Sequence, residues 1–443
     1  MNRRHFLHQT GAAGLSTLLV PEILQAAPGA KKRIAMVGTG HRGTSMWGSS
    51  VVEEFGDIVE FVGLCDSNPG RVETGRKMIG VQCPTFTDFE KMMKETKPEL
   101  LIVTSMDGVH HEHIVRGLEL GADIITEKPM TIDEKKCQLI LDAEKRTGRK
   151  VHVTFNYRFS PHRQKIYELL REGAIGEITS VDFHWYLDVH HGADYFRRWH
   201  RLRKNGGSLL VHKSTHHFDL LNWWLQSEPE EVYAYGALEH YGKNNAFRHT
   251  HCRPCPHKSE CKFYWDINKS ARLVKLYADN EKYDGYHRDG CVWREDIDIF
   301  DKMAVQIRYA NKVQVSYSLT TYSPYEGYRI SFNGTKGKLD AWIQESQPWE
   351  AEKFDEIQVT SNFGKREIIR VSNTEAGHGG GDVRLRKQLF KPDGNDPLKQ
   401  IAGSRDGAMS ILVGIAARNS IDTGMPVKIA SLTSLKPMAS REV

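Results

Sequence analysis

Short apolar runs alternate with helix-length stretches through the first third of the chain. The runs are continuous, as in parallel strands buried on both faces, and glycines close the helical stretches between them. This alternation implies a parallel sheet with right-handed crossover helices. We therefore predict an α/β domain over residues 31–155. Its expected strands are 33–37, 60–65, 100–104, 123–126 and 151–155, and its expected helices include 111–120 and 133–147.

After residue 156 the pattern changes to an alternation of apolar and polar positions. Such segments, joined by short turns, predict antiparallel hairpins with one covered face. Residues 156–430 are expected to form an α+β domain with an open, mainly antiparallel sheet. A homo-oligomer would form through this sheet, and helices covering the sheet are the alternative. The expected elements are hairpins pairing 303–309 with 313–319 through Ala310-Asn311 and 328–332 with 338–342, a helix near 404–423, and a tail over 431–443.

Residues 1–30 resemble a twin-arginine export signal, with Arg3-Arg4 before Phe6-Leu7 and a modestly apolar stretch at 11–20. Small residues follow near residue 27, as at a cleavage site. The sequence therefore predicts recognition by the twin-arginine export machinery and a periplasmic location, with an N-terminal tail as the alternative. No apolar run is long enough to span a membrane in the mature chain. The net charge is +5, and the basic residues are interleaved with acidic ones. This distribution gives no support for nucleic-acid binding.

A glycine-rich turn follows the first predicted strand. Gly38 allows the turn, Gly40 lets the backbone approach a pyrophosphate, and Gly43 lets the next helix pack closely. The N–H groups and the dipole at that helix start favour an anion. The sequence predicts a dinucleotide site that also includes the intervening residues Thr39, His41 and Arg42.

Asp66 ends the second apolar run, where a carboxylate would accept hydrogen bonds from the adenosine ribose. It would repel a 2′-phosphate, so NAD is favoured over NADP, although the cations His41 and Arg42 weaken this preference. Glu127-Lys128-Pro129 follows the expected strand 123–126, at the same sheet edge. Near a positive nicotinamide ring the pKa of Lys128 should fall, which suits a proton partner or a hydroxyl-orienting donor.

These motifs together resemble the Gfo/Idh/MocA family of sugar oxidoreductases, and the resemblance covers most of the chain after the signal. The resemblance implies a Rossmann domain that binds NAD(P), and a sugar or polyol held against the second domain, with Lys128 contacting substrate. The segment Thr104 to His110 is similar to the family's loop near the nicotinamide, with Met106 in place of the usual proline. The resemblance adds Thr104, Asp107, His110, Glu127 and Lys128 to the cofactor site, and Asn156 and Arg158 to the substrate site.

The family's third motif matches the segment after Gly206-Gly207. His216 matches the catalytic histidine, and Asp219 matches the acid one turn later. His212 stands where the family has an aspartate. If one helix carries both histidines, they share a face and could relay a proton, bind sugar hydroxyls or hold a metal; paired structural histidines are the alternative.

A segment rich in aromatic and charged residues precedes this motif and is expected to line the sugar pocket. Aromatic faces stack on sugar C–H surfaces, whereas Asp, Arg and His bind hydroxyls; aromatic residues also build ordinary cores. The predicted substrate contacts are Trp185, Asp188, Tyr195, Arg198 and Trp199, with Lys213 as a second cation near the pocket.

Four of the seven cysteines cluster in an insert over residues 249–295: Cys252, Cys255, Cys261 and Cys291. Their thiolates suffice for a structural zinc ion or an iron–sulfur cluster. Disulfides are the alternative in an oxidising compartment, and free thiols are the third reading.

The predicted activity is oxidation of a sugar or glycoside CH–OH group, with His216 as acid/base, Lys128 as hydroxyl orienter and His212 as a relay. A periplasm holds no free nicotinamide pool, so the cofactor should stay bound and be restored in each cycle. An NAD-dependent glycoside hydrolase, which oxidises, eliminates, adds water and reduces again, is one alternative. A non-catalytic sugar-binding protein on the same scaffold is the other.

Overall fold

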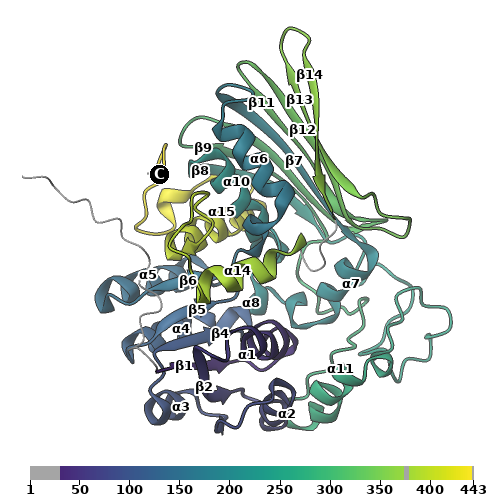
Figure 1. Cartoon of the computed structure of the whole chain (residues 1–443). Coiled ribbons are helices and arrows are strands. Elements are labelled where there is room, and N and C mark those ends of the chain that lie inside the picture. The colour runs from purple at the N-terminus through teal and green to yellow at the C-terminus, as the bar shows by residue number, and fades with distance from the viewer. Residues whose placement is uncertain (1–29, 374–378, 442–443) are drawn as a thin grey trace, which may run out of the picture.

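Two β-sheets, one below the other in Figure 1, organise the molecule. The computed structural model describes residues 30–373 and 379–441. The expected export signal at 1–30 lies outside these residues, apart from Ala30. Within the described part, no helix combines the length and apolar character that a membrane crossing requires.

The first sheet has seven strands in the order β15-β6-β5-β4-β1-β2-β3. All neighbours are parallel except β15, which returns from the C-terminal part of the chain to pair antiparallel with β6. The strands are β1 Lys32–Val37, β2 Val59–Cys65, β3 Thr85–Phe86, β4 Leu100–Val103, β5 Asp123–Thr126, β6 Val151–Val153 and β15 Ala402–Gly403.

Crossover helices connect these strands, and their ends follow local capping rules. The side chains of Asn68, Asp88 and Asp133 cap helix N-termini, and Gly80 and Gly148 end helices in the left-handed conformation. The helices are α1 Ser50–Phe55, which continues a π-helical turn over Gly43–Ser49, α2 Pro69–Ile79, α3 Phe89–Thr96, α4 His110–Glu119 and α5 Glu134–Thr147.

The second sheet has nine strands in the order β14-β13-β12-β11-β7-β10-β9-β8-β16, and only β7 and β10 pair in parallel. Apolar side chains alternate with exposed ones along β9, so one face is buried. The strands are β7 Ile178–Asp188, β8 Pro229–Ala237, β9 Lys302–Tyr309, β10 Gln314–Ser323, β11 Glu326–Gly334, β12 Gly337–Ser346, β13 Phe354–Ser361, β14 Arg366–Ser372 and β16 Val427–Lys428.

Helices cover one face of this sheet and leave the other bare (Figure 1). α10 and α15 pack against each other beneath it, and α15 also contacts β8 of the large sheet and β6 of the small one. The remaining helices are α6 Pro161–Arg171, α7 Val189–Arg197, α8 Arg203–Gly206, α9 Leu209–His212, α10 Thr215–Leu225, α11 Ala271–Leu276, α12 Glu281–Asp284, α14 Gly381–Phe390 and α15 Ser404–Thr423.

The predicted fold class is confirmed: a parallel α/β domain precedes an α+β domain with a mainly antiparallel sheet. Both expected hairpins form, as β9–β10 and β11–β12. Nothing in the local pattern indicated β15, because its pairing depends on residues far along the chain.

Candidate active site

The glycine turn between β1 and the first helix is built by close backbone contacts. Gly38 has φ +95°, and a Cβ there would lie 2.5 Å from the backbone of Thr104 and Ser105. Thr104 bonds the turn from β4, since its Oγ1 donates to the Gly38 carbonyl at 2.5 Å. The turn therefore has the tight geometry that a dinucleotide site requires, and Thr104 supports it.

Asp66 lies beside this turn, at the end of β2, and is 7% exposed. Its Oδ2 accepts hydrogen bonds from the backbone N and the hydroxyl of Thr39 at 2.8 and 3.1 Å. Its Oδ1 is 3.1 Å from Arg71 Nη1, and the other end of that guanidinium is 2.5 Å from Asp284. Two carboxylates therefore pair with Arg71, a cation beside the predicted ribose-binding acid.

The cysteine-bearing insert between β8 and β9 reaches back over the same turn. The Tyr277 hydroxyl accepts the backbone N–H of His41 at 2.8 Å, and Arg272 donates to Thr44 at 2.8 Å. The carbonyl of Asn280 accepts from Asn68 at 2.9 Å. Figure 1 shows the insert, with α11, next to α2. We name residues 271–284 the clasp, because they fasten the second domain onto the cofactor turn.

Cations surround His41 at the helix start. Burial lowers the pKa of His41, and the charges of Arg272, Arg198 and Arg288 lower it further. A cluster of arginines at a helix N-terminus favours a diphosphate. Arg198, expected to bind sugar, belongs to this cluster and pairs with Asp194 at 3.0 Å.

Arg42 and Glu127, predicted as cofactor contacts, bond to protein groups instead. Arg42 Nε is 2.8 Å from Glu127 Oε1, and its other nitrogens are 3.1 Å from Asp382 of α14. The indole N–H of Trp47 also donates to Glu127. Burial opposes the charge of Arg42, but both carboxylates raise its pKa. Asn156, predicted as a substrate contact, donates to Asp382 at 2.6 Å and so joins this network.

Lys128 projects from the loop after β5 toward a buried pair of side chains. Its Nζ is 3.4 Å from His212 Nε2 and donates to the His212 carbonyl at 3.2 Å. The opposite ring nitrogen, His212 Nδ1, is 2.5 Å from Asp107 Oδ2. His110 holds the loop in place, with its Nδ1 2.9 Å from the Pro129 carbonyl. Asp107, His212 and Lys128 thus form one hydrogen-bonded chain.

The charges in this chain are strongly perturbed. Burial lowers the pKa of Lys128 to about 8, with Lys213 and Arg42 adding to the shift and Asp107 and Glu127 opposing it. Burial, then the charge of Lys128, holds the pKa of His212 well below its usual range. Burial also raises the pKa of Asp107. Such shifts are typical of acid–base sites, and the lowered pKa of His212 keeps its ring neutral.

Aromatic rings enclose His212 on its other sides. The ring of His200 lies 4.1 Å away and is itself stacked on Trp199 at 3.5 Å. Tyr195 meets His212 edge-on at 5.3 Å. Asp107, His200 and His212 have ligand atoms within 4.8 Å of one another, which a metal ion could use. The Lys128 ammonium next to His212 Nε2 opposes a cation at this point.

A second polar cluster lies beside the first. Lys213 Nζ donates to the hydroxyl of Tyr157 at 3.0 Å and to Glu326 at 3.2 Å. The other oxygen of Glu326 is 2.6 Å from His191 Nδ1. Burial opposes the charge of Lys213, yet Tyr157 and Glu326 raise its pKa well above the usual range. His191 stacks on Tyr195 at 5.0 Å, which joins this cluster to the His212 group.

His212 and His216 do not share one helix, so the condition for a shared helix face is not met. α9 ends at His212, and α10 begins at Thr215. The break gives the two rings different neighbours: His212 contacts Asp107 and Lys128, whereas His216 stacks on Tyr157 at 4.1 Å.

Four residues that were predicted to contact the sugar have structural roles in the fold. Trp185 is 0% exposed and stacks on His217 at 3.9 Å and on Tyr328, so no face is open to a ligand. Arg158 and Asp219 form a buried ion pair at 2.6 Å. Asp188 accepts from the backbone N–H groups that begin α7, as a helix cap.

Sequence reasoning missed Arg71, Glu326 and Tyr277. Arg71 lies five positions after Asp66, at the start of the helix that follows β2, so a search for cations near the ribose acid could have found it. Glu326 and Tyr277 reach the site only through the long-range pairing of β11 and the folding of the insert. No local signal marked them.

Comparisons with known proteins agree with this geometry. Family models described as "Oxidoreductase family, NAD-binding Rossmann fold" and "Oxidoreductase family, C-terminal alpha/beta domain" match residues 32–155 and 167–429. The chain is 38% identical over 427 residues to YteT of Bacillus subtilis (strain 168), an oxidoreductase by name, covering 91% of this chain and 99% of that protein.

Two further matches are weaker. "Glycosyl hydrolase family 109 protein 1" of Akkermansia muciniphila is 26% identical over 197 residues, 41% of this chain and 40% of that protein. A solved levoglucosan dehydrogenase in complex with NADH and levoglucosan superposes with a TM-score of 0.64 at 19% identity, covering 90% of this chain and all (100%) of that one. This second match shows the shared fold.

Proposed function

We propose that this chain, which belongs to the Gfo/Idh/MocA oxidoreductase family, oxidises a CH–OH group of a sugar or glycoside. The oxidant is a nicotinamide dinucleotide that stays bound and is restored within each cycle. The observation that carries the proposal is the hydrogen-bonded chain of Asp107, His212 and Lys128, which begins at the end of β5 on the same sheet edge as the glycine turn.

Three features of the described residues fit a bound dinucleotide. The turn at Gly38 admits no Cβ, the arginines around His41 balance a diphosphate, and Asp66 lies where a ribose would be recognised. When bound, the nicotinamide ring supplies the hydride acceptor. The pairing of Arg71 with Asp66 and Asp284 favours NAD over NADP, since a 2′-phosphate would meet two carboxylates.

Proton transfer is assigned to the Lys128–His212 pair. Lys128 orients the sugar hydroxyl, and its neutral amine or the neutral His212 ring takes the hydroxyl proton. Asp107 fixes the ring by holding Nδ1, which leaves Nε2 directed at Lys128. His212 therefore replaces His216 as the preferred acid–base group, and Lys213, Glu326 and His191 form a second group that could hold other hydroxyls.

We further propose that the mature protein is exported by the twin-arginine route to the periplasm and keeps its cofactor there. The clasp supports the retention of the cofactor, because its residues bond to His41, Thr44 and Asn68 around the dinucleotide turn. A homo-oligomer through the bare face of the large sheet also stays a proposal, and exposed Tyr235 and Trp342 lie on strands of that sheet.

Redox-neutral glycoside hydrolysis is the second candidate. Oxidation next to a C–H bond acidifies it, so the glycosidic bond can be eliminated, water added and the ketone reduced again. This cycle needs a second proton-transfer group, and the cluster of Lys213, Glu326 and His191 next to His212 offers one. The partial match to a family 109 hydrolase favours the same reading. A non-catalytic sugar-binding protein on the same scaffold is the remaining alternative.

Two assays on the purified full chain test the proposal. Mass spectrometry of the small molecules released by acid should find NAD(H) in stoichiometric amount. A panel of sugars and glycosides should then yield a keto-sugar if the enzyme is an oxidoreductase, or a free aglycone without net dinucleotide reduction if it is a hydrolase. Protein that carries and binds no dinucleotide would contradict both activities.

A further inference from the structure

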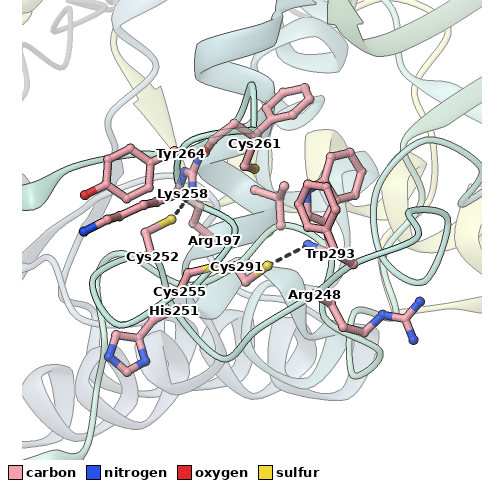
Figure 2. Close-up of a pocket in the computed structure, with 13 residues that line it drawn as sticks. Arg197, Arg248, His251, Cys252, Cys255, Lys258, Cys261, Tyr264, Cys291 and Trp293 are labelled. Atoms are coloured by element: carbon pink, nitrogen blue, oxygen red, sulfur yellow. Dashed lines mark hydrogen bonds between the residues drawn. The ribbon is translucent and has the colours of Figure 1, made fainter.

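The four clustered cysteines converge on one small space in the insert. Figure 2 shows the side chains of Cys252, Cys255, Cys261 and Cys291 directed toward a common centre, with Trp293 at its wall. Phe247 and Phe263 complete an apolar lining, and Arg197 enters from α7. All four sulfurs are unbridged, so no disulfide joins them. Residues far apart in the sequence have thus been brought together around this centre.

Backbone contacts fix the arrangement. Cys252 N–H donates to the Asp289 carbonyl at 2.8 Å, and Cys291 N–H donates to the Thr250 carbonyl at 3.1 Å, which binds the two ends of the insert to each other. Within the first knuckle, Cys255 N–H donates to the Cys252 carbonyl at 3.1 Å. The backbone of the insert therefore sets the positions of the thiols without the help of a metal.

Hydrogen-bond donors are aimed at two of the sulfurs. Arg197 Nη1 lies 3.2 Å from Cys252 Sγ, and the backbone N–H of Trp293 lies 3.4 Å from Cys291 Sγ. Figure 2 marks both contacts. Donors of this kind stabilise thiolates that ligate a metal and tune iron–sulfur centres. The Arg197 cation also offsets part of the negative charge of four thiolates.

The spacing of the sulfurs separates two kinds of centre. A tetrahedral zinc ion, with Zn–S bonds of about 2.3 Å, brings its four sulfurs to within about 4 Å of one another. Among the described residues, the sets of three or more ligand atoms that lie within 4.8 Å of one another contain no cysteine. The four sulfurs are therefore spaced more widely than the ligands of a tetrahedral zinc ion.

We propose that Cys252, Cys255, Cys261 and Cys291 ligate an iron–sulfur cluster, which fills this apolar centre and stabilises the insert. The cluster would hold together the segment that carries the clasp, whose residues Arg272 and Tyr277 follow Cys261 and precede Cys291. No electron-transfer step is assigned to the cluster. The metal site does not depend on the proposed sugar chemistry, because its ligands are all outside the Lys128–His212 group.

Metal and sulfide analysis of the full chain, purified without oxygen, tests this site. The wild type should contain iron and acid-labile sulfide in equal amounts and show broad visible absorbance. Cys252→Ser and Cys261→Ser should each lose most of the iron, whereas Cys137→Ser, which changes a buried cysteine of α5, should keep it. If Cys252→Ser fails to fold, the partly exposed Cys261→Ser gives the same test.

Reconstitution of the wild type with ferrous iron and sulfide gives a second measurement that needs no variant. It should restore the visible spectrum to protein that has lost its cluster in air. Zinc in place of iron, a protein with neither metal that also resists reconstitution, or iron retained in both ligand variants would each overturn the proposal. A dinucleotide found in the same samples would be unaffected by these outcomes, so the proposed function is tested separately.

Discussion

At the scale of single residues, the protonation state of Lys128 should govern the rate of sugar oxidation. The lowered pKa of about 8 means that the amine becomes neutral, and able to accept a proton, as the pH rises through that value. His212 stays neutral across this range because its pKa is far lower. The single-turnover oxidation rate should therefore rise with pH and level off above about 8. A flat profile from about pH 6 to 9 would remove Lys128 from proton transfer.

Asp284 should contribute to the preference for NAD. It binds one end of the Arg71 guanidinium, and Asp66 binds the other. Asp284→Asn removes one negative charge and should free Arg71 for a 2′-phosphate, so the ratio of the NADP to the NAD dissociation constants should fall by about tenfold, or about 1.4 kcal/mol. Titration of both dinucleotides measures it. Asp279→Asn, on the same segment, is the control, and an unchanged ratio would show that Arg71 does not face the ribose.

Lys128 could be predicted from the sequence because Pro129 and the end of an apolar run fix its place at the sheet edge. The same reasoning failed for Trp185. Its aromatic neighbours in the sequence suggested a sugar platform, but alternation along β7 sends its side chain into the core. A residue on a half-buried strand faces either the ligand side or the core, and only the register decides which.

At the scale of elements, the clasp should slow the release of the dinucleotide. Tyr277→Phe removes the hydroxyl that accepts the His41 N–H, a contact worth about 0.5–1.5 kcal/mol, so the dissociation rate should rise by up to about tenfold. Displacement of bound NADH, followed by fluorescence, measures this rate. The exposed Tyr283→Phe is the matched control. Equal release rates in both variants would show that the clasp does not retain the cofactor.

The break between α9 and α10 is an element that spacing could not reveal. The i, i+4 interval of His212 and His216 suits one continuous helix, but Lys213 and Ser214 interrupt it. Tertiary bonds explain the break, since Lys213 donates to Tyr157 and Glu326 and Ser214 shares a hydrogen bond with Tyr317. Local periodicity predicts a helix correctly where tertiary packing agrees with it. It fails where hydrogen bonds of buried polar groups require a different backbone conformation.

At the scale of the whole molecule, the Arg158–Asp219 pair should matter for stability rather than for substrate affinity. Arg158 connects α10, through Asp219, to Asp406 at the start of α15 and to the carbonyl of Lys399. Asp219→Ala leaves a buried cation with one fewer partner and should cost about 3–5 kcal/mol of unfolding free energy. Denaturant melts and KM, measured together, test this. A raised KM with unchanged stability would restore the substrate role.

The two sheets were predictable because their strands differ in period, continuous in one domain and alternating in the other. The contacts between the two domains were not predictable. β15, α14 and the clasp all return to the first domain from distant parts of the chain, and such returns leave no local trace. The candidate site lies where these segments meet. Its residues on the first domain were therefore predictable, whereas many of the residues that contact them from distant segments were not.

The most direct test is a single-turnover experiment on the purified full chain loaded with NAD. The absorbance of the bound cofactor is followed after rapid mixing with a reactive glycoside, in the wild type, in Lys128→Ala and in the control Lys135→Ala, which alters an exposed lysine of α5. We expect transient or lasting reduction of the dinucleotide in the wild type and the control. The rate should be about 10²–10⁴-fold lower in Lys128→Ala, at equal dinucleotide content. Conversion of the glycoside with no change in the bound dinucleotide, or an unchanged rate in Lys128→Ala, would contradict the proposed function.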